Sequence, residues 1–267
     1  MTGNAAIMGE HHHRAWVGPP DYFDRLGAAQ FVTLVLLGMR ETHSLLDIGC
    51  GSLRGGRFSL LYLNKGNYYG LEPEKWCLEC GIAAEVGQDL IRLKCPSFSY
   101  RDDFDASHFR RKFDYILASG IFMHTGHSQL SSCLKKAAGV LKKGGLFIGA
   151  YLEGDTDSVC GRWTYPEIQH FRTSTIRSAA EEAGLQIMFP DMHHPLNHNW
   201  FVASLPASSD KLRQSLQLNA LSWSEYLACQ IAARGGIRRS YEDYLKEELA
   251  VRLSPGDKTV VPQVHLK

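Results

Sequence analysis

Short apolar runs alternate with amphipathic stretches along most of the chain, and this alternation predicts a succession of strands and helices. Strands are predicted where the runs are short, over residues 44–48, 67–71, 98–100, 113–118, 146–151, 186–189 and 200–204. Helices are predicted where apolar residues recur at helical spacing, over residues 57–63, 73–85, 128–140 and 174–183. Strands that alternate with helices favour a mostly parallel, doubly wound α/β sheet with helices on both faces.

The two ends of the chain differ from this alternating region. Residues 1–18 predict an irregular arm that ends at Gly18-Pro19-Pro20, and apolar spacing from Asp21 to about Met39 predicts a helix with Asp21 as its N-cap. After Pro206 the sequence becomes polar with helical periodicity. We therefore expect an N-terminal arm and helix over 1–43, a core over 44–206, and a helical C-terminal extension over 207–267.

Composition and charge indicate a folded chain and give no reason to expect a nucleic-acid or membrane partner. Of the 267 residues, 44% are hydrophobic and 21% charged, the net charge is +1 and the isoelectric point is about 7.7. No apolar run reaches the length of a membrane span and no signal-peptide pattern is present, so we expect a cytoplasmic protein. The seven scattered cysteines favour reduced thiols over a disulfide framework.

A glycine-rich loop follows the first strand of the predicted core. The segment LLDIGCGSLRGGR has glycines at positions 49, 51, 55 and 56. A phosphate-binding loop of the GxxxxGK[S/T] type would need a lysine and a hydroxyl where Arg57 and Phe58 stand, and GxGxxG would need a third glycine that is missing. The segment does contain an acid, Asp47, two residues before a GxG pair.

Acids also follow the next two predicted strands. A carboxylate at a strand end can accept two hydrogen bonds from a vicinal diol, so Glu72, 21 residues beyond Gly51, suits a ribose. Asp103 follows the third strand, where an adenine amino group could be met. Ligands of open α/β sheets bind beyond the carboxyl ends of the strands, and three acids at successive ends share that rim. The pattern indicates a nucleoside site.

These segments resemble the motifs of class I S-adenosylmethionine (SAM)-dependent methyltransferases. LLDIGCG resembles motif I, YYGLEPE the second strand with its ribose-binding acid, FDYILASGIFMHT the fourth strand, and LKKGGLFIGAYLEGD the turn and fifth strand. The similarity runs in order over about residues 44–205. It implies a seven-stranded sheet with an antiparallel last strand, an N-terminal arm that folds over the site as a lid, SAM across the strand ends, and S-adenosylhomocysteine (SAH) as the product.

The resemblance also assigns cofactor contacts by motif. Glycines 49 and 51 would line the methionine part of SAM with Asp47, Glu72 would hold the ribose, Asp102 or Asp103 with Phe104 would border the adenine, and the Ser119 carbonyl would receive the SAM amine. The third glycine of motif I falls at Leu53, so the glycine requirement has moved or been relaxed, and Arg54 could reach the SAM carboxylate or the substrate. The expected cofactor-binding set is Asp47, Gly49, Cys50, Gly51, Arg54, Glu72, Asp102, Asp103, Phe104 and Ser119.

Histidines and aromatic residues gather where the acceptor is expected. We predict His124 as the general base, with His194 and His198 as second choices. A metal site made from His193, His194 and His198 lacks an acid at ligand spacing beyond Asp191, so we expect no metal. The expected substrate-contacting residues are Trp16, Tyr22, His127, Tyr151, Trp163 and Trp200.

We therefore predict a methyltransferase that acts on an oxygen, rather than a nitrogen, of a small organic acceptor. The alternatives are a protein or peptide methyltransferase and a non-catalytic SAM-fold binding or assembly protein. No Asn/Asp-Pro-Pro-Tyr/Phe motif follows the fourth strand and Cys95-Pro96 has the reverse order of a catalytic Pro-Cys pair, which disfavours nucleic-acid bases. The extension over 207–267 could cover the sheet edge, cap the pocket or form a homodimer contact.

Overall fold

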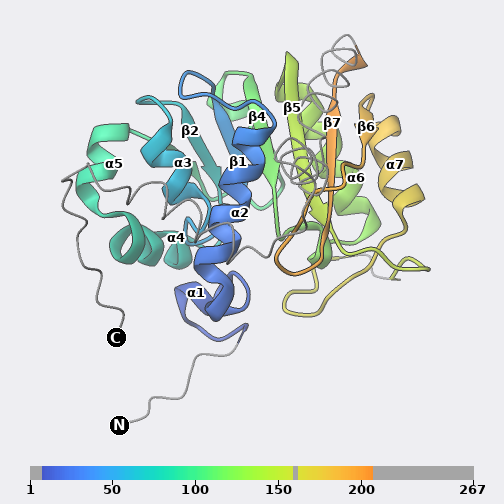
Figure 1. Ribbon diagram of the computed structural model, residues 1–267, viewed down its shortest axis with the longest axis horizontal. Helices are drawn as coiled ribbons and strands as arrows, with labels where there is room; N and C mark the ends of the chain where they lie inside the picture. The colour runs from blue at the N-terminus through green and yellow to red at the C-terminus, as the bar shows by residue number, and fades with distance from the viewer. Residues whose placement is uncertain (1–7, 159–161, 207–267) are drawn as a thin grey trace, which may run out of the picture. The chain divides into compact units, whose positions relative to one another are not determined.

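The computed structural model describes residues 8–158 and 162–206, and its centre is one seven-stranded sheet (Figure 1). The strand order is β3-β2-β1-β4-β5-β7-β6. The strands are β1 (Leu45–Ile48), β2 (Tyr68–Leu71), β3 (Ser97–Ser99), β4 (Phe113–Ala118), β5 (Leu141–Tyr151), β6 (Gln186–Met188) and β7 (Asn199–Ser204). The predicted extension over 207–267 lies outside the described residues.

The strand pairing confirms a mostly parallel sheet with an antiparallel last strand. Across the sheet, the neighbouring strands in the series β3-β2-β1-β4-β5 are parallel, whereas β7 is antiparallel to both β5 and β6. In β1, Asp47 is in register with Gly70 of β2 on one side and Leu117 of β4 on the other. The connections leave β1 and β4 in different directions, which opens a crevice between their carboxyl ends.

Helices cover both faces of the sheet, as the alternating pattern predicts. The helices are α1 (His13–Trp16), η1 (Pro20–Tyr22), α2 (Phe23–Leu36), α3 (Gly56–Tyr62), α4 (Lys75–Gly81), η2 (Ile82–Val86), α5 (Gln88–Lys94), η3 (Ser107–Phe109), η4 (Phe122–His124), α6 (His127–Val140) and α7 (Thr173–Glu182). Leu34, Leu60 and Leu78 of α2, α3 and α4 pack in one buried cluster, and Leu134 and Ile176 of α6 and α7 pack in another. None of the described helices is both long and apolar enough to cross a lipid bilayer.

Three predicted boundaries are wrong for local reasons. Asp21 lies inside η1, and α2 begins at Phe23 without a side-chain N-cap. The helix predicted over 73–85 is divided into α4 and the π-helical η2, and Gly87 (φ 83°) then separates it from α5, which the sequence did not predict. The strand predicted over 146–151 is longer than expected, because residues 141–145 are also part of β5, whose pairing with β4 shifts register there.

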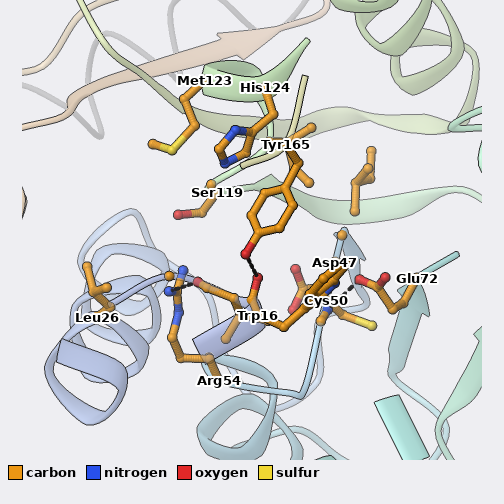
Figure 2. A pocket seen from close by; sticks show the side chains of 18 of the residues that line it. Trp16, Leu26, Asp47, Cys50, Arg54, Glu72, Ser119, Met123, His124 and Tyr165 are labelled. Carbon is orange, nitrogen blue, oxygen red and sulfur yellow. Dashed lines mark hydrogen bonds between the residues drawn. The ribbon is translucent and has the colours of Figure 1, made fainter. Parts of the chain in front are cut away.

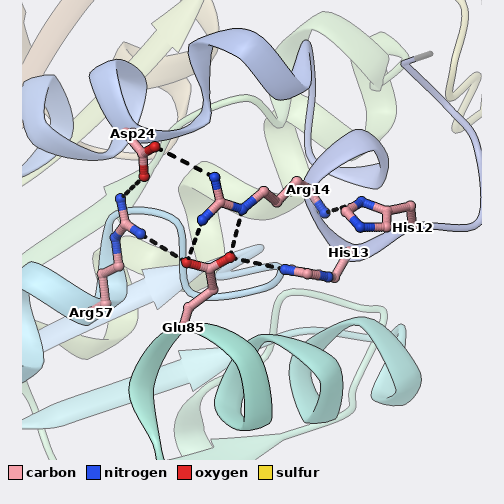
Figure 3. Close-up of polar contacts among 6 residues, drawn as sticks. All are labelled: His12, His13, Arg14, Asp24, Arg57 and Glu85. Atoms are coloured by element: carbon pink, nitrogen blue, oxygen red, sulfur yellow. Dashed lines mark hydrogen bonds and ion pairs between the residues drawn. The ribbon is translucent and has the colours of Figure 1, made fainter. Parts of the chain in front are cut away.

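The N-terminal arm contains the short helix α1 and is attached to the core by a cluster of charged residues (Figure 3). Glu85 of η2 accepts hydrogen bonds from His13 at 2.9 Å, from Arg14 at 2.6 and 2.9 Å, and from Arg57 of α3 at 2.9 Å. Asp24 of α2 pairs with both arginines. Burial alone would raise the pKa of Glu85, but the bonds from Arg14 and His13 hold it below its usual value. The cluster fixes the arm against α2, α3 and η2.

Candidate active site

A cavity of about 680 Å³ lies at the carboxyl ends of the central strands (Figure 2). Its wall combines the arm, the glycine loop after β1, the segments after β2, β3 and β4, and the loop between β6 and β7. The sequence-predicted residues that line it are Trp16, Asp47, Gly49, Cys50, Gly51, Arg54, Glu72, Asp102, Phe104, Ser119, His124, Trp163, His194 and His198. Segments far apart in the sequence therefore form one site, because the carboxyl ends of parallel strands meet at the same edge of the sheet.

Asp47 is a buried carboxylate at the end of β1. Its Oδ2 accepts a hydrogen bond from the hydroxyl of Tyr68 in β2 at 2.7 Å. Burial raises the pKa of Asp47 to about 6, while the Tyr68 bond and the positive charge of Arg54 oppose that rise. The group is therefore mainly ionised at neutral pH and can receive an ammonium group.

The first two glycines of the loop have backbone conformations and surroundings that exclude a side chain. Gly49 has φ 69° and Gly51 has φ 54°, both in the left-handed region. A Cβ atom at Gly49 would lie 2.0 Å from Cδ1 of Ile121, and one at Gly51 would lie 2.5 Å from Cγ1 of Val17. The arm and the loop after β4 thus pack directly on the glycine loop.

Leu53 keeps the left-handed backbone that the third motif I glycine would supply. Its φ is 61° and its side chain is fully buried in the core, so burial offsets a conformational cost of about 1–2 kcal/mol. The positions at which there is no room for a side chain are instead Gly55 and Gly56. A Cβ atom at Gly55 would lie 2.3 Å from Oε1 of Gln30, and one at Gly56 would lie 2.3 Å from the Tyr68 hydroxyl. The conformational requirement stays at position 53 and the spatial requirement lies at positions 55 and 56.

Glu72 is held by backbone donors in an orientation suited to a diol. Its Oε2 accepts from the Gly51 N–H at 2.8 Å and its Oε1 from the Glu74 N–H at 2.9 Å. Burial raises the pKa of Glu72 to about 7, and the two backbone bonds oppose this. Each carboxylate oxygen keeps a further lone pair, so hydroxyl donors from the cavity would both be satisfied and favour the ionised form.

Asp102 and Phe104 line the cavity, whereas Asp103 does not. Asp103 forms ion pairs with Arg101 and Lys136, and the Arg101 bond holds its pKa well below the usual range. Of the two acids that the sequence analysis expects beside the adenine, only Asp102 is part of the cavity wall.

His124 presents a lone pair rather than an N–H at its Nε2. Its Nδ1 lies 2.9 Å from the carbonyl oxygen of Glu167. A carbonyl can only accept, so Nδ1 carries the proton and Nε2 is the basic atom of the neutral ring. Burial lowers the pKa of His124, and the Glu167 carbonyl opposes the shift. The ring packs against Tyr165 (Figure 2) and against Trp163 at the cavity wall.

His194 and His198 lie in the same cavity, and the hydrogen bonds of His194 give it the opposite tautomer to His124. Nδ1 of His194 accepts from the N–H groups of Leu196 at 3.2 Å and His198 at 3.4 Å, so its Nε2 carries the proton and acts as a donor. Burial is the main cause that lowers the pKa of His194 to about 3 and of His198 to about 4. The rings stack at 4.2 Å. His194 therefore lacks a basic Nε2, which weakens it as a second-choice base.

Four predicted substrate-contacting residues do not line this cavity. Tyr22 lies under the Arg25 guanidinium, and His127 is exposed at the start of α6. Tyr151 and Trp200 are core residues of β5 and β7 that border a smaller cavity of about 260 Å³. In a strand, adjacent side chains point to opposite faces, and the sequence alone did not fix which face these aromatics occupy.

Gln30 is a cavity residue that the sequence analysis missed. It is buried on α2 and donates from Nε2 to the Ser119 hydroxyl at 2.9 Å. The available signal was a polar residue four positions after Leu26 and four before Leu34, within the apolar stripe of a helix. Within residues 8–158 and 162–206 no group of three His, Cys, Asp or Glu side chains is placed to hold a metal ion.

Comparison with known proteins identifies similar sequences and folds. A family model described as a methyltransferase domain matches residues 46–147. A probable fatty acid methyltransferase of Pseudomonas putida is 26% identical over 157 residues, which is 54% of this chain. The match covers only 38% of the length of that curated relative.

Solved structures of similar fold cover about two thirds of the chain. The glycopeptide N-methyltransferase MtfA is 12% identical, with a TM-score of 0.54 over 67% of this chain and 90% of that one. The CcbJ methyltransferase from Streptomyces caelestis is 15% identical, with a TM-score of 0.52 over 70% of this chain and 97% of that one. At these identities the likeness shows a shared fold.

Proposed function

We propose that this chain, which belongs to the class I SAM-dependent methyltransferases, transfers a methyl group from SAM to an oxygen atom of a small organic acceptor. One observation carries the proposal. A single cavity joins the glycine loop and the strand-end carboxylates Asp47 and Glu72 to the basic Nε2 of His124.

The cofactor half of the cavity fits SAM in its donor groups. Asp47 and the Ser119 carbonyl would receive the amine, Glu72 the ribose hydroxyls, and Asp102 with Phe104 would border the adenine. Bound SAM supplies a methyl group that is already activated on a sulfonium. The protein therefore needs only to align the acceptor, exclude water and remove a proton.

His124 would remove that proton. As the new O–C bond forms and the S–C bond breaks, the acceptor hydroxyl proton moves to Nε2 of His124. The Glu167 carbonyl holds the Nδ1–H in place and stabilises the positive charge that develops on the ring. A neutral amine acceptor would need the same proton transfer, so nitrogen is the second candidate atom.

The arm would close the site over a small acceptor. The Tyr165 hydroxyl donates to the Trp16 carbonyl oxygen at 2.6 Å (Figure 2). Trp16 also packs on the rings of Tyr165 and Trp76. This bond joins the arm to the segment that carries Trp163 and Glu167. A cavity of about 680 Å³ that must also hold SAM supports a small molecule over a protein or peptide acceptor, and the contacts of Trp16 with its wall support a lid function for the arm within residues 1–43.

Binding and turnover measurements test the proposal. We expect SAM and SAH to bind the full chain in calorimetry, and a tritiated-SAM screen of a small-molecule extract to label an organic product. His124→Ala should lose turnover and keep SAH affinity. The matched control is His127→Ala, which changes an exposed histidine of the same segment outside the cavity. Failure to bind either ligand would instead favour a non-catalytic scaffold.

A further inference from the structure

Arg54 is a buried cation that forms no ion pair with a carboxylate in the described part of the chain, although the charge of Asp47 acts on it without direct contact. Its side chain is 9% exposed, its Nη1 donates to the Val17 carbonyl oxygen, and its Nε has no hydrogen-bond partner. A buried charge is stable only when an opposite charge or a set of hydrogen bonds compensates it. The guanidinium lines the cavity, so a ligand in the cavity could supply an anion in direct contact with it.

The guanidinium lies where the arm and the loop after β4 meet. Nη1 lies 3.1 Å from the position that a Gly18 Cβ would take, and Nη2 lies 3.6 Å from that of Gly120. Gly120 begins the segment that leads to His124. The positive charge of Arg54 also adds to burial in lowering the pKa of His194 and His198. The positive charge therefore acts on these two histidines as well as on Asp47.

Among the described residues, no acid lines the side of the cavity formed by His124, His194 and His198. The carboxylates lining the cavity are Asp47, Glu72, Glu74 and Asp102, which follow or end the first three strands. The side lined by histidines instead has the basic Nε2 of His124, which can accept a proton, and the Nε2–H of His194, which can donate a hydrogen bond. An acceptor there meets one cation, one N–H donor and one proton acceptor.

We infer that the acceptor is an organic acid whose carboxylate binds Arg54, while a hydroxyl of the same molecule faces His124. The inference rests on the proposed function and names the substrate class. A guanidinium can donate two parallel hydrogen bonds to a carboxylate, which fixes both the position and the orientation of the acid. The N–H of His194 adds a donor for the same anion.

SAM also has a carboxylate, so the test must separate two sources of the same group. SAH contains that carboxylate, whereas 5′-methylthioadenosine lacks the amino-acid part. If Arg54 serves the acceptor, Arg54→Met will leave the affinity for both nucleosides within about twofold. If Arg54→Met weakens SAH at least tenfold and leaves methylthioadenosine unchanged, the cation serves the cofactor and the inference is wrong.

The second measurement concerns the acceptor and compares the binding of acids with that of their amides to the SAH-saturated full chain. The probes are salicylate with salicylamide and 4-hydroxycinnamate with its amide, titrated by calorimetry. We expect the wild-type protein to prefer at least one acid over its amide by about tenfold or more, and Arg54→Met to remove that preference. Arg54→Lys, which keeps the charge without the planar fork, should retain part of it.

Two controls keep the outcome interpretable. Arg92→Met removes an exposed arginine that pairs with Asp89 on the surface, and it should leave every affinity unchanged. Thermal unfolding checks that the Arg54 variants are folded. The inference is overturned if the wild type binds no acid, or if Arg54→Met keeps the acid preference. Loss of SAH binding by the wild type would contradict the proposed function itself.

Discussion

The two proposed halves of the cavity are built in different ways: a cofactor half around Asp47 and Glu72, and an acceptor half around His124 and Trp16. In the cofactor half, Glu72 is bonded to backbone N–H groups of the glycine loop and its own strand exit, and Asp47 to a neighbouring strand. In the acceptor half, His124 depends on the carbonyl of Glu167, 43 residues later, and Trp16 on the hydroxyl of Tyr165. The first half is set by short motifs on the sheet, whereas the second exists only when distant loops and the arm come together.

The largest expected effect is on the acceptor half, through His124. His124→Gln should lower kcat by about a hundredfold or more, because a general base contributes on that order. The effect should appear in kcat with SAH affinity unchanged. If cofactor binding falls equally, the two halves are not independent and the comparison fails.

The pH dependence of turnover tests the same residue without a substitution. The base must be neutral, so activity falls as the pH drops through its pKa. Burial lowers the pKa of His124 below the ordinary histidine value of 6.5, and the acid limb of kcat/KM for the acceptor, measured at saturating SAM, should therefore have its midpoint below pH 6.5. A midpoint above that value would contradict the buried, neutral His124 described above.

The cofactor half is tested by Glu72→Gln. An amide can accept from only one of the two backbone N–H groups that Glu72 satisfies, so SAH affinity should fall about tenfold to a hundredfold. SAH affinity of the wild type should also weaken as the pH falls through about 7, where Glu72 takes up a proton. That step near pH 7 should be absent from the variant.

The neighbouring carboxylate provides a matched control for this prediction. Glu74→Gln changes a cavity residue whose side chain bonds only to the Trp76 indole in the described structure. It should alter SAH affinity by less than about threefold, since a hydrogen bond at an exposed position contributes little. Equal losses in both variants would mean that overall charge, not the fixed geometry of Glu72, controls binding.

Sequence reasoning predicted the cofactor half better than the acceptor half for a physical reason. Asp47, Gly49 and Glu72 lie within one or two residues of strand ends, so the order of strands fixes their place. Whether Tyr151 and Trp200 face the cavity depends on which side of a strand they occupy and on packing from remote segments. Gln30 and the hydrogen-bonding state of His194 depend on tertiary contacts that no local motif records.

A smaller effect is expected from Glu85→Gln, which asks whether the acceptor half needs the arm. The substitution removes the anion that three basic side chains share, and it should lower the free energy of unfolding by about 3 kcal/mol. Because the Glu85 pKa is lowered in the folded state, this stability should be present above the unfolded pKa and disappear as the pH falls through the folded one. Urea titrations at several pH values measure both.

Asp24→Asn is the control for the charged cluster. Its side chain is 63% exposed, so the loss in the free energy of unfolding should stay below about 1 kcal/mol.

Glu85→Gln should also raise the KM for the acceptor more than it weakens the binding of SAH, since the arm carries Trp16 over the cavity. The opposite order would show that the arm serves the cofactor half.

The smallest expected effect concerns Leu53, where one residue combines both kinds of constraint. Leu53→Ala leaves a cavity in the core and keeps a side chain at φ 61°, whereas Leu53→Gly leaves the cavity and relieves the backbone. At ordinary helix and strand positions glycine is less stable than alanine by about 0.5–1 kcal/mol. Here the glycine variant should be the more stable of the two by about 1 kcal/mol, because the left-handed conformation costs alanine more than the added chain entropy costs glycine. Urea unfolding of the pair gives this difference directly, and an alanine variant equal to or better than glycine would show that the loop does not need the left-handed backbone at this position.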